Sequence, residues 1–112
     1  MYFNVINMKT IFMLPYPITI HGFTDSGDKI EIESITEIRN FIKLNFVKVE
    51  RINSFCISCL LVEIIRKNLH VSVTNGMVIS AMILEGFKFK KCGYNAIFNL
   101  SKKSIQKFLP YK

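Results

Sequence analysis

The chain contains no tryptophan, only three cysteines, and no apolar run long enough to span a membrane. Its longest apolar stretches, residues 55–62 and 77–84, are far shorter than the roughly 18–20 residues that a bilayer requires. Residues 1–17 lack the basic and apolar regions of a cleaved signal peptide. An odd number of cysteines without such a leader is typical of reduced thiols in a cytosol. We therefore expect an intracellular, cytoplasmic protein with no membrane partner.

Acidic residues are scarce in the second half of the chain. Residues 1–50 hold five basic and six acidic side chains, whereas residues 51–112 hold ten basic and two acidic ones. The net charges of the two halves are therefore −1 and +8. This asymmetry favours a polyanion as the partner of the second half. The alternative is a solvated surface that keeps an apolar chain in solution.

Hydrophobic residues, in contrast, are plentiful. They make up 50% of the 112 residues, and ten of them are phenylalanine. Such a chain can bury a core, and its length is that of one domain. We expect an α+β fold in a single small domain over residues 1–112. Residues 1–53 would form a β-rich part with a hairpin and one helix, and residues 54–112 a basic, winged-helix-like part.

Alternating patterns predict strands near the start of the chain. Residues 2–13, with β-branched and aromatic side chains, are expected to form one strand. The turn cluster at residues 25–28 then predicts a hairpin of residues 18–23 with residues 29–33. This hairpin would keep one face in water, because its charged residues alternate with isoleucines.

A helical pattern follows the predicted hairpin. Ser34 and Glu37 fit a capping box for a helix that should end near Asn45. Its apolar stripe has helical spacing and comprises Ile35, Ile38 and Ile42. Residues 46–52 could then form a short strand with their two valines turned inward.

Two more helices are predicted in the second part. Ser54 can cap a helix over residues 55–68, whose wide apolar face indicates burial. Thr74 or Asn75 can cap another over residues 75–85. Both caps would satisfy backbone N–H groups that have no partner within the helix.

A basic hairpin is predicted after these helices. Gly86 and Phe87 end the helix, and residues 87–100 alternate in the manner of two paired strands. Phenylalanine, alanine and leucine would form the inner face, and lysine and asparagine the outer one. Residues 101–109 would close this part as a short basic helix.

Residues 54–100 resemble the winged-helix module at the C-terminus of phage and poxvirus-type primase-helicases. In that family a capped helix ends in Leu-x-x-x-Gly-Phe and leads into a basic wing. Met82 stands here at the leucine position, and Gly86 and Phe87 follow at the expected spacing. The resemblance implies a DNA-binding module. It does not imply the parent enzyme, because the chain has no glycine-rich phosphate loop ending in Gly-Lys-Ser or Gly-Lys-Thr.

The candidate nucleic-acid-binding residues are those placed to meet phosphates or bases. Lysines supply most of the sequence-independent affinity for a duplex, and those in position are Lys88, Lys90, Lys91, Lys102 and Lys103. On the helix over residues 75–85 the residues expected to be exposed are Asn75, Gly76, Ile79, Ser80 and Ile83. Of these, Asn75 and Ser80 are the polar candidates. Such a face reads bases poorly, so we expect little sequence specificity. The resemblance implies DNA rather than RNA as the partner.

Two cysteines, Cys56 and Cys59, have the spacing of a CxxC motif. It permits a thioredoxin-like redox pair, or a zinc site completed from Cys92, His70 and His21. The favoured interpretation is that Cys56 and Cys59 are small buried residues on a core helix. No residue set points to catalysis, so we expect no enzyme activity, no metal and no cofactor.

These observations favour a small, non-enzymatic, nucleic-acid-binding accessory protein of a virus, phage or other mobile element. The alternative is a protein-interaction inhibitor, such as an anti-defence or host-takeover protein that binds a host protein. It would use the face of Ile79 and Ile83, or the edge of the hairpin over residues 18–33. A sheet edge of that kind could also support a homodimer.

Overall fold

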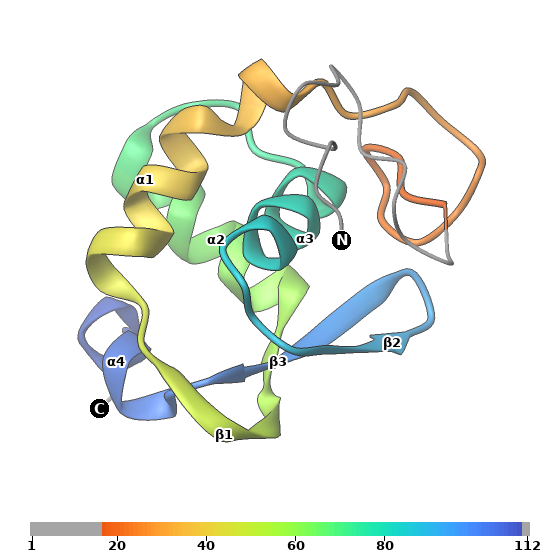
Figure 1. Ribbon diagram of the computed structural model, residues 1–112. Coiled ribbons are helices and arrows are strands. Elements are labelled where there is room, and N and C mark those ends of the chain that lie inside the picture. The colour runs from red at the N-terminus through yellow and green to blue at the C-terminus, as the bar shows by residue number, and fades with distance from the viewer. Residues whose placement is uncertain (1–16, 111–112) are drawn as a thin grey trace.

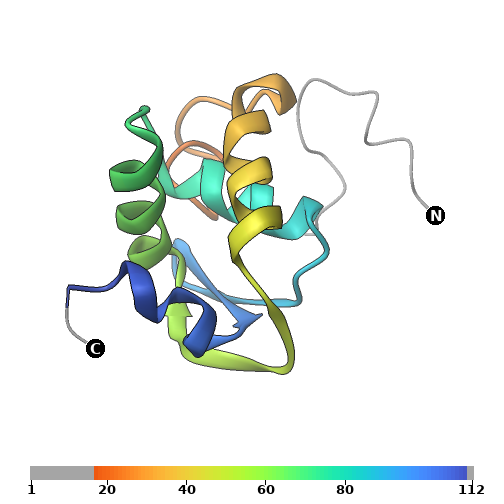
Figure 2. The ribbon, with the colours of Figure 1, turned by 90° about the vertical axis from the view of Figure 1, so that its left-hand side faces the viewer.

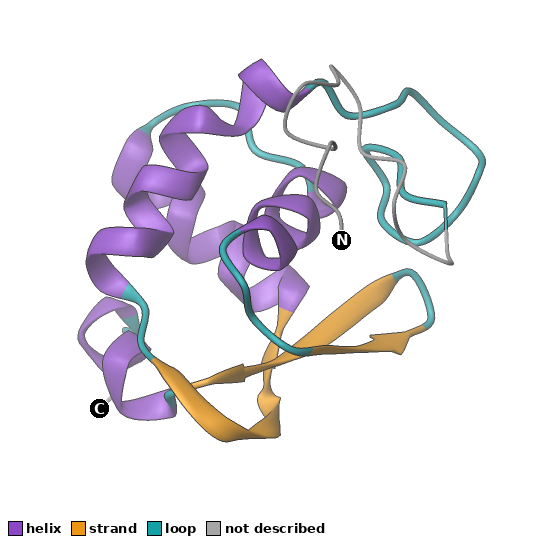
Figure 3. Ribbon diagram, viewed as in Figure 1, coloured by secondary structure: helices purple, strands orange, loops and turns teal. Residues whose placement is uncertain are grey.

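The computed structural model describes residues 17–110, with the backbone alone at Cys56. Its helices cover one side of a three-stranded antiparallel sheet (Figures 1 and 3). In chain order the elements are η2 (Ile32–Ile35), α1 (Thr36–Asn45), β1 (Lys48–Ile57), α2 (Ser58–Leu69), α3 (Asn75–Leu84), β2 (Phe89–Cys92), β3 (Asn95–Leu100), α4 (Lys102–Ile105) and η3 (Gln106–Phe108). The predicted α+β class is confirmed, and so is the order of two helices and a hairpin in the second part.

The sheet has β3 at its centre, between β1 and β2. Figure 2 shows α1 and α2 side by side, with α3 crossing behind them and the strands below. None of the helices within residues 17–110 is long and apolar enough to cross a membrane. The arrangement leaves two strands, β1 and β2, with one edge each that no other strand of the sheet covers.

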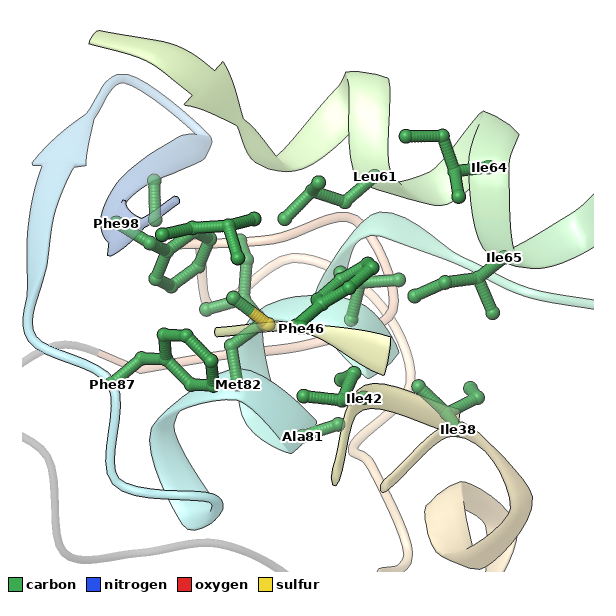
Figure 4. Packing of buried hydrophobic residues seen from close by; sticks show 14 of the residues in the cluster. Ile38, Ile42, Phe46, Leu61, Ile64, Ile65, Ala81, Met82, Phe87 and Phe98 are labelled. Atoms are coloured by element: carbon green, nitrogen blue, oxygen red, sulfur yellow. The ribbon is translucent and has the colours of Figure 1, made fainter. Parts of the chain in front are cut away.

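The core lies where the three long helices meet the sheet. The side chain of Met82 points between Phe46 and Phe87, while α1 and α2 contribute isoleucines and Leu61 from either side (Figure 4). Phe98 of the central strand is fully buried beneath them. The predicted stripe of α1 is confirmed, because the fully or almost fully buried residues include Ile35, Ile38 and Ile42.

The start of α1 differs from the predicted capping box. Ser34 lies inside the 3-10 turn η2, where its backbone N–H and its hydroxyl both donate to the carbonyl of Glu31, at 3.1 and 2.6 Å. The helix itself begins at Thr36 and has no side-chain cap. The capping prediction is therefore wrong, because the hydroxyl of Ser34 is already hydrogen-bonded within the preceding 3-10 turn.

The boundary between β1 and α2 also differs from prediction. Strand β1 continues through Ile57, so that Ser54 lies in a strand and α2 begins only at Ser58. Pairing with β3 decides this, since Asn53 lies opposite Phe98 and Ile57 opposite Ile97. Tertiary pairing overrides local preference here, as it often does for strands.

The two valines near the start of β1 face solvent. Val47 and Val49 are 56% and 41% exposed, so their predicted inward position is wrong. The register between β1 and β3 shifts twice, once between Lys48 and Asn53. Extra residues on one strand change which side chains face the core.

Residues 17–31 form a loop in which the two arms of the predicted hairpin meet at an isolated antiparallel bridge, without a continuous ladder among the described residues. Within the described residues, Thr19 makes only isolated bridges, to Gly22 and to Lys29. Its hydroxyl donates to the carbonyl of Ser26 at 3.0 Å, which folds the loop back on itself. The strand predicted at residues 2–13 lies outside the described residues.

This loop packs against the beginning of α3. The N–H of Gly76 donates to the carbonyl of Ile20 at 3.0 Å, and an added Cβ at Gly76 would lie 1.7 Å from the carbonyl oxygen of Thr19. The predicted cap is confirmed, because the hydroxyl of Thr74 accepts from the N–H of Met77 at 3.2 Å. The predicted exposed face is wrong, since Gly76, Ile79 and Ser80 are all buried.

We predict that Gly76→Ala destabilises the protein by about 2 kcal/mol, because the new methyl group collides with the backbone of Thr19, which can move only if the loop shifts. Helix propensity alone predicts the opposite sign, a stabilisation of about 1 kcal/mol. The free energy of unfolding in urea distinguishes the two.

The matched control is Gly93→Ala, where an added Cβ meets no atom within 4 Å and only the positive φ of 63° is unfavourable. It should cost about 1 kcal/mol. A Gly76→Ala protein as stable as the wild type would show that the loop does not pack as described.

Candidate nucleic-acid interface

The candidate interface is built on the hairpin of β2 and β3, which we call the wing (residues 88–100). Cys92 pairs with Asn95, so the connecting turn consists of Gly93 and Tyr94. Gly93 has a φ of 63°, as the first residue of a type II′ turn requires. This turn sets the register in which Phe89 lies opposite Phe98 and Lys90 opposite Ile97.

The inner face of the wing is as predicted, with Ala96, Phe98 and Leu100 fully buried. Asn99 was expected on the outer face, but it is only 4% exposed. Its side chain accepts from the N–H of Lys88 at 2.6 Å and donates to the carbonyl of Val49 at 2.8 Å. It therefore joins β1 to the residue that precedes β2.

The predicted lysines of the wing, Lys88, Lys90 and Lys91, are all exposed. The ammonium of Lys88 donates to the carbonyl of Glu50 in β1 at 3.3 Å. Lys102 and Lys103 are exposed in α4, and the ammonium of Lys102 lies 4.5 Å from the ring centre of Phe55, also in β1. Strand β1 thus contacts lysines from both groups.

The two groups do not form one cluster, because α4 and β2 lie toward opposite ends of the sheet (Figure 1). Both lysine groups lie in a part of the chain that has no acidic residue. Residues 86–112 contain seven lysines and no aspartate or glutamate. Glu33 and Glu37 belong to η2 and the first turn of α1, at the end of the molecule away from the sheet (Figure 1). The wing and α4 therefore carry only basic charges, whereas β1 beside them carries Glu50.

The two polar candidates on α3 are not available to a partner. The amide of Asn75 donates to the carbonyls of His21 and Tyr94, at 3.2 and 3.3 Å. Ser80 is fully buried, and its hydroxyl has no hydrogen-bond partner within residues 17–110. Their expected exposure is wrong, because the loop over residues 17–31 holds Asn75 at the start of α3, and the rest of α3 is packed among α1, α2 and η2.

One exposed residue of the wing was not among the predicted site residues. Tyr94 is 63% exposed at the turn, and its carbonyl accepts from the N–H of Phe23 at 2.9 Å. The sequence indicates that Tyr94 lies in a turn, because Gly93 and Tyr94 separate two alternating runs. The hydrogen bond between Tyr94 and Phe23 could not be predicted, because it joins segments that are far apart in the chain.

The cysteines are placed differently from expectation. Cys59 lies exposed in the first turn of α2, so its predicted burial is wrong, and Cys92 is exposed in the wing. Cys56 lies in β1 and not on a helix. In the described part of the chain, no group of three or more His, Cys, Asp or Glu residues is arranged to hold a metal ion.

A small cavity of about 220 Å³ lies between α1 and the sheet, lined by Ile42, Lys43, Phe46, Lys48, Glu85 and Phe87. Its one carboxylate, Glu85, is bound by the guanidinium of Arg39 at 2.7 Å. The ammonium of Lys48 lies 5.3 Å from the ring centre of Phe87. The cavity is smaller than the roughly 300–1,000 Å³ of pockets that bind drug-sized molecules.

No family model matches the chain, and no curated protein or solved structure matches it. Function is therefore inferred from the wing, its charges and its surroundings.

We predict that Ser80→Ala stabilises the protein by about 1 kcal/mol, because it removes a buried hydroxyl that makes no hydrogen bond among the described residues. Urea unfolding measures the change. Ser58→Ala is the matched control, since Ser58 is equally buried but its hydroxyl donates to Asn95 and accepts from the N–H of Ala96.

The control should be destabilised by about 1–3 kcal/mol. If Ser80→Ala is destabilised as much as Ser58→Ala, the hydroxyl of Ser80 makes a hydrogen bond and the prediction is wrong.

Proposed function

We propose that this protein is a small, non-enzymatic DNA-binding protein that contacts phosphates through its wing. The observation that carries the proposal is the exposure of Lys88, Lys90 and Lys91 on one hairpin, in a stretch without any acidic residue. The resemblance of residues 54–100 to a primase-helicase module supports DNA over RNA. It also supports an intracellular role as an accessory protein of a virus, phage or other mobile element.

Binding through the wing would be largely independent of sequence. Base edges are read by side chains that enter a groove, and α3 is buried among α1, α2 and η2, with the loop over residues 17–31 at its start. Lysine–phosphate contacts remain, and these fix position and supply affinity without reading bases. Lys102 and Lys103 would extend the contact along the sheet, past β1.

We predict that Lys88→Ala/Lys90→Ala weakens DNA binding and lowers the slope of log affinity against log salt by about 2, since each lost phosphate contact contributes about 0.9 on duplex DNA. Fluorescence anisotropy with a short labelled duplex over a salt series measures both quantities.

The matched control is Arg66→Ala/Lys67→Ala, which removes the same charge from the last turn of α2, at the end of that helix remote from the sheet (Figure 2). It should leave the slope nearly unchanged. The proposal fails if the wild type does not bind near about 0.1 M salt, or if both variants lower the slope equally.

A second candidate function is protein binding, and a different surface favours it. The predicted face is not available, because Ile79 is fully buried. Four exposed apolar residues instead follow one another from the end of α1 into β1, and we call them the β1 apolar strip: Leu44 (83% exposed), Val47, Val49 and Ile52 (36%). Strand β1 is an edge strand, and apolar edges pair readily with another chain.

A second copy of the chain is the partner that can be tested directly. We predict a concentration-dependent dimer that Val49→Glu abolishes, because a charge at the strip opposes its burial. Sedimentation velocity measures the association. Asn40→Glu, on the exposed part of α1, is the control and should dimerise like the wild type. If the wild type stays monomeric over the concentration range, the homodimer prediction is wrong.

A further inference from the structure

The turn of the wing presents an aromatic ring to solvent. Tyr94 is 63% exposed, and within residues 17–110 its ring takes part in no stacking or cation–π contact. Phe55 differs in this respect, because the ammonium of Lys102 lies over its ring at 4.5 Å. The ring at the tip of the hairpin is therefore accessible to a partner.

The backbone beneath this ring is firmly held. The carbonyl of Tyr94 accepts from the N–H of Phe23 at 2.9 Å and from the amide of Asn75 at 3.3 Å. Gly22 lies so close that an added Cβ would be 2.1 Å from the same carbonyl oxygen. The loop over residues 17–31, the start of α3 and the wing therefore meet at this residue. A group fixed in place before binding loses less entropy when it binds.

The surroundings of the ring suit a nucleic acid strand. Lys90 and Lys91 precede the turn and are exposed, while Gly93 has no atom within 4 Å of the position where a side chain would begin. The turn thus has open space beside Gly93, and two exposed lysines precede it in the chain. Cations that follow the backbone together with aromatic rings that stack on bases are the combination by which proteins hold single strands.

We propose that the ring of Tyr94 stacks on an unpaired base, so that the wing prefers single-stranded DNA to fully paired DNA. This inference rests on the proposed function, since the lysines must first bring the strand to the turn. Bases inside a duplex are already stacked on one another. The ring therefore gains a partner only where a strand is open.

The test compares three labelled ligands of equal length, about 12 nucleotides, which is within the range bound by single-strand modules. They are a single strand, its blunt duplex, and the same strand with abasic sites throughout, which keeps the phosphates and lacks the bases. We expect the wild type to bind the single strand about tenfold more tightly than either of the others. Charge alone would favour the duplex, which has more phosphates.

Tyr94→Ala should lose about tenfold in affinity for the single strand and change little on the duplex or the abasic strand. Tyr94→Phe should bind like the wild type, because the ring and not the hydroxyl does the stacking. A strand carrying 2-aminopurine reports the contact directly, since its fluorescence falls on stacking. Thermal unfolding of the variants verifies that they fold.

The outcomes separate the two proposals. If the wild type binds none of the ligands, the proposed function fails and this inference fails with it. If it binds, and Lys88→Ala/Lys90→Ala weakens binding while Tyr94→Ala does not, the stacking is overturned and phosphate binding stands. If Tyr94→Ala weakens all three ligands alike, or Tyr94→Phe behaves like Tyr94→Ala, the ring does not act on unpaired bases and the inference is overturned.

Discussion

The structure depends on one backbone contact, between the loop over residues 17–31 and the start of α3. The N–H of Gly76 donates to the carbonyl of Ile20, and only a residue without a side chain allows this approach. The contact closes the start of α3, whose remaining length is packed against α1 and α2. It fixes the loop to the core. Because Asn75 also donates to Tyr94, the same junction positions the tip of the wing.

Local patterns in the sequence predicted the features that short stretches of chain decide. The stripe of Ile35, Ile38 and Ile42 has the spacing of a helix face, and these residues are buried. Thr74 precedes an apolar helical run, and it caps that helix. The alternation in residues 87–100 gave both the hairpin and its exposed lysines. The α+β class follows from such local signals, as does much of the candidate site.

The features that the sequence did not predict depend on distant partners. Strand β1 extends to Ile57 because β3 pairs with it, and neither Ser54 nor Ser58 reports that pairing. Asn99 looked like an outer residue, yet the central position of β3 gives it hydrogen-bond partners on both sides, Val49 in β1 and Lys88 just before β2. Asn75 and Ser80 were expected to be exposed, but the loop that holds Asn75 and the helices that bury Ser80 are placed by distant parts of the chain. Apolar residues that recur every two or every 3.6 residues identify the buried face of a strand or a helix. They do not identify the segment that packs against that face.

The pairing of β1 with β3 has a consequence for the order of folding. It joins Lys48 to Leu100, and contacts between residues so distant in sequence slow folding, because a long loop must close before they form. On the ribosome, α3 emerges before the strand that completes the sheet beneath it. The apolar surface of α3 stays exposed until β3 has emerged, and exposed apolar segments of this kind favour aggregation. The yield of folded protein should therefore depend on how soon β3 follows α3 out of the ribosome.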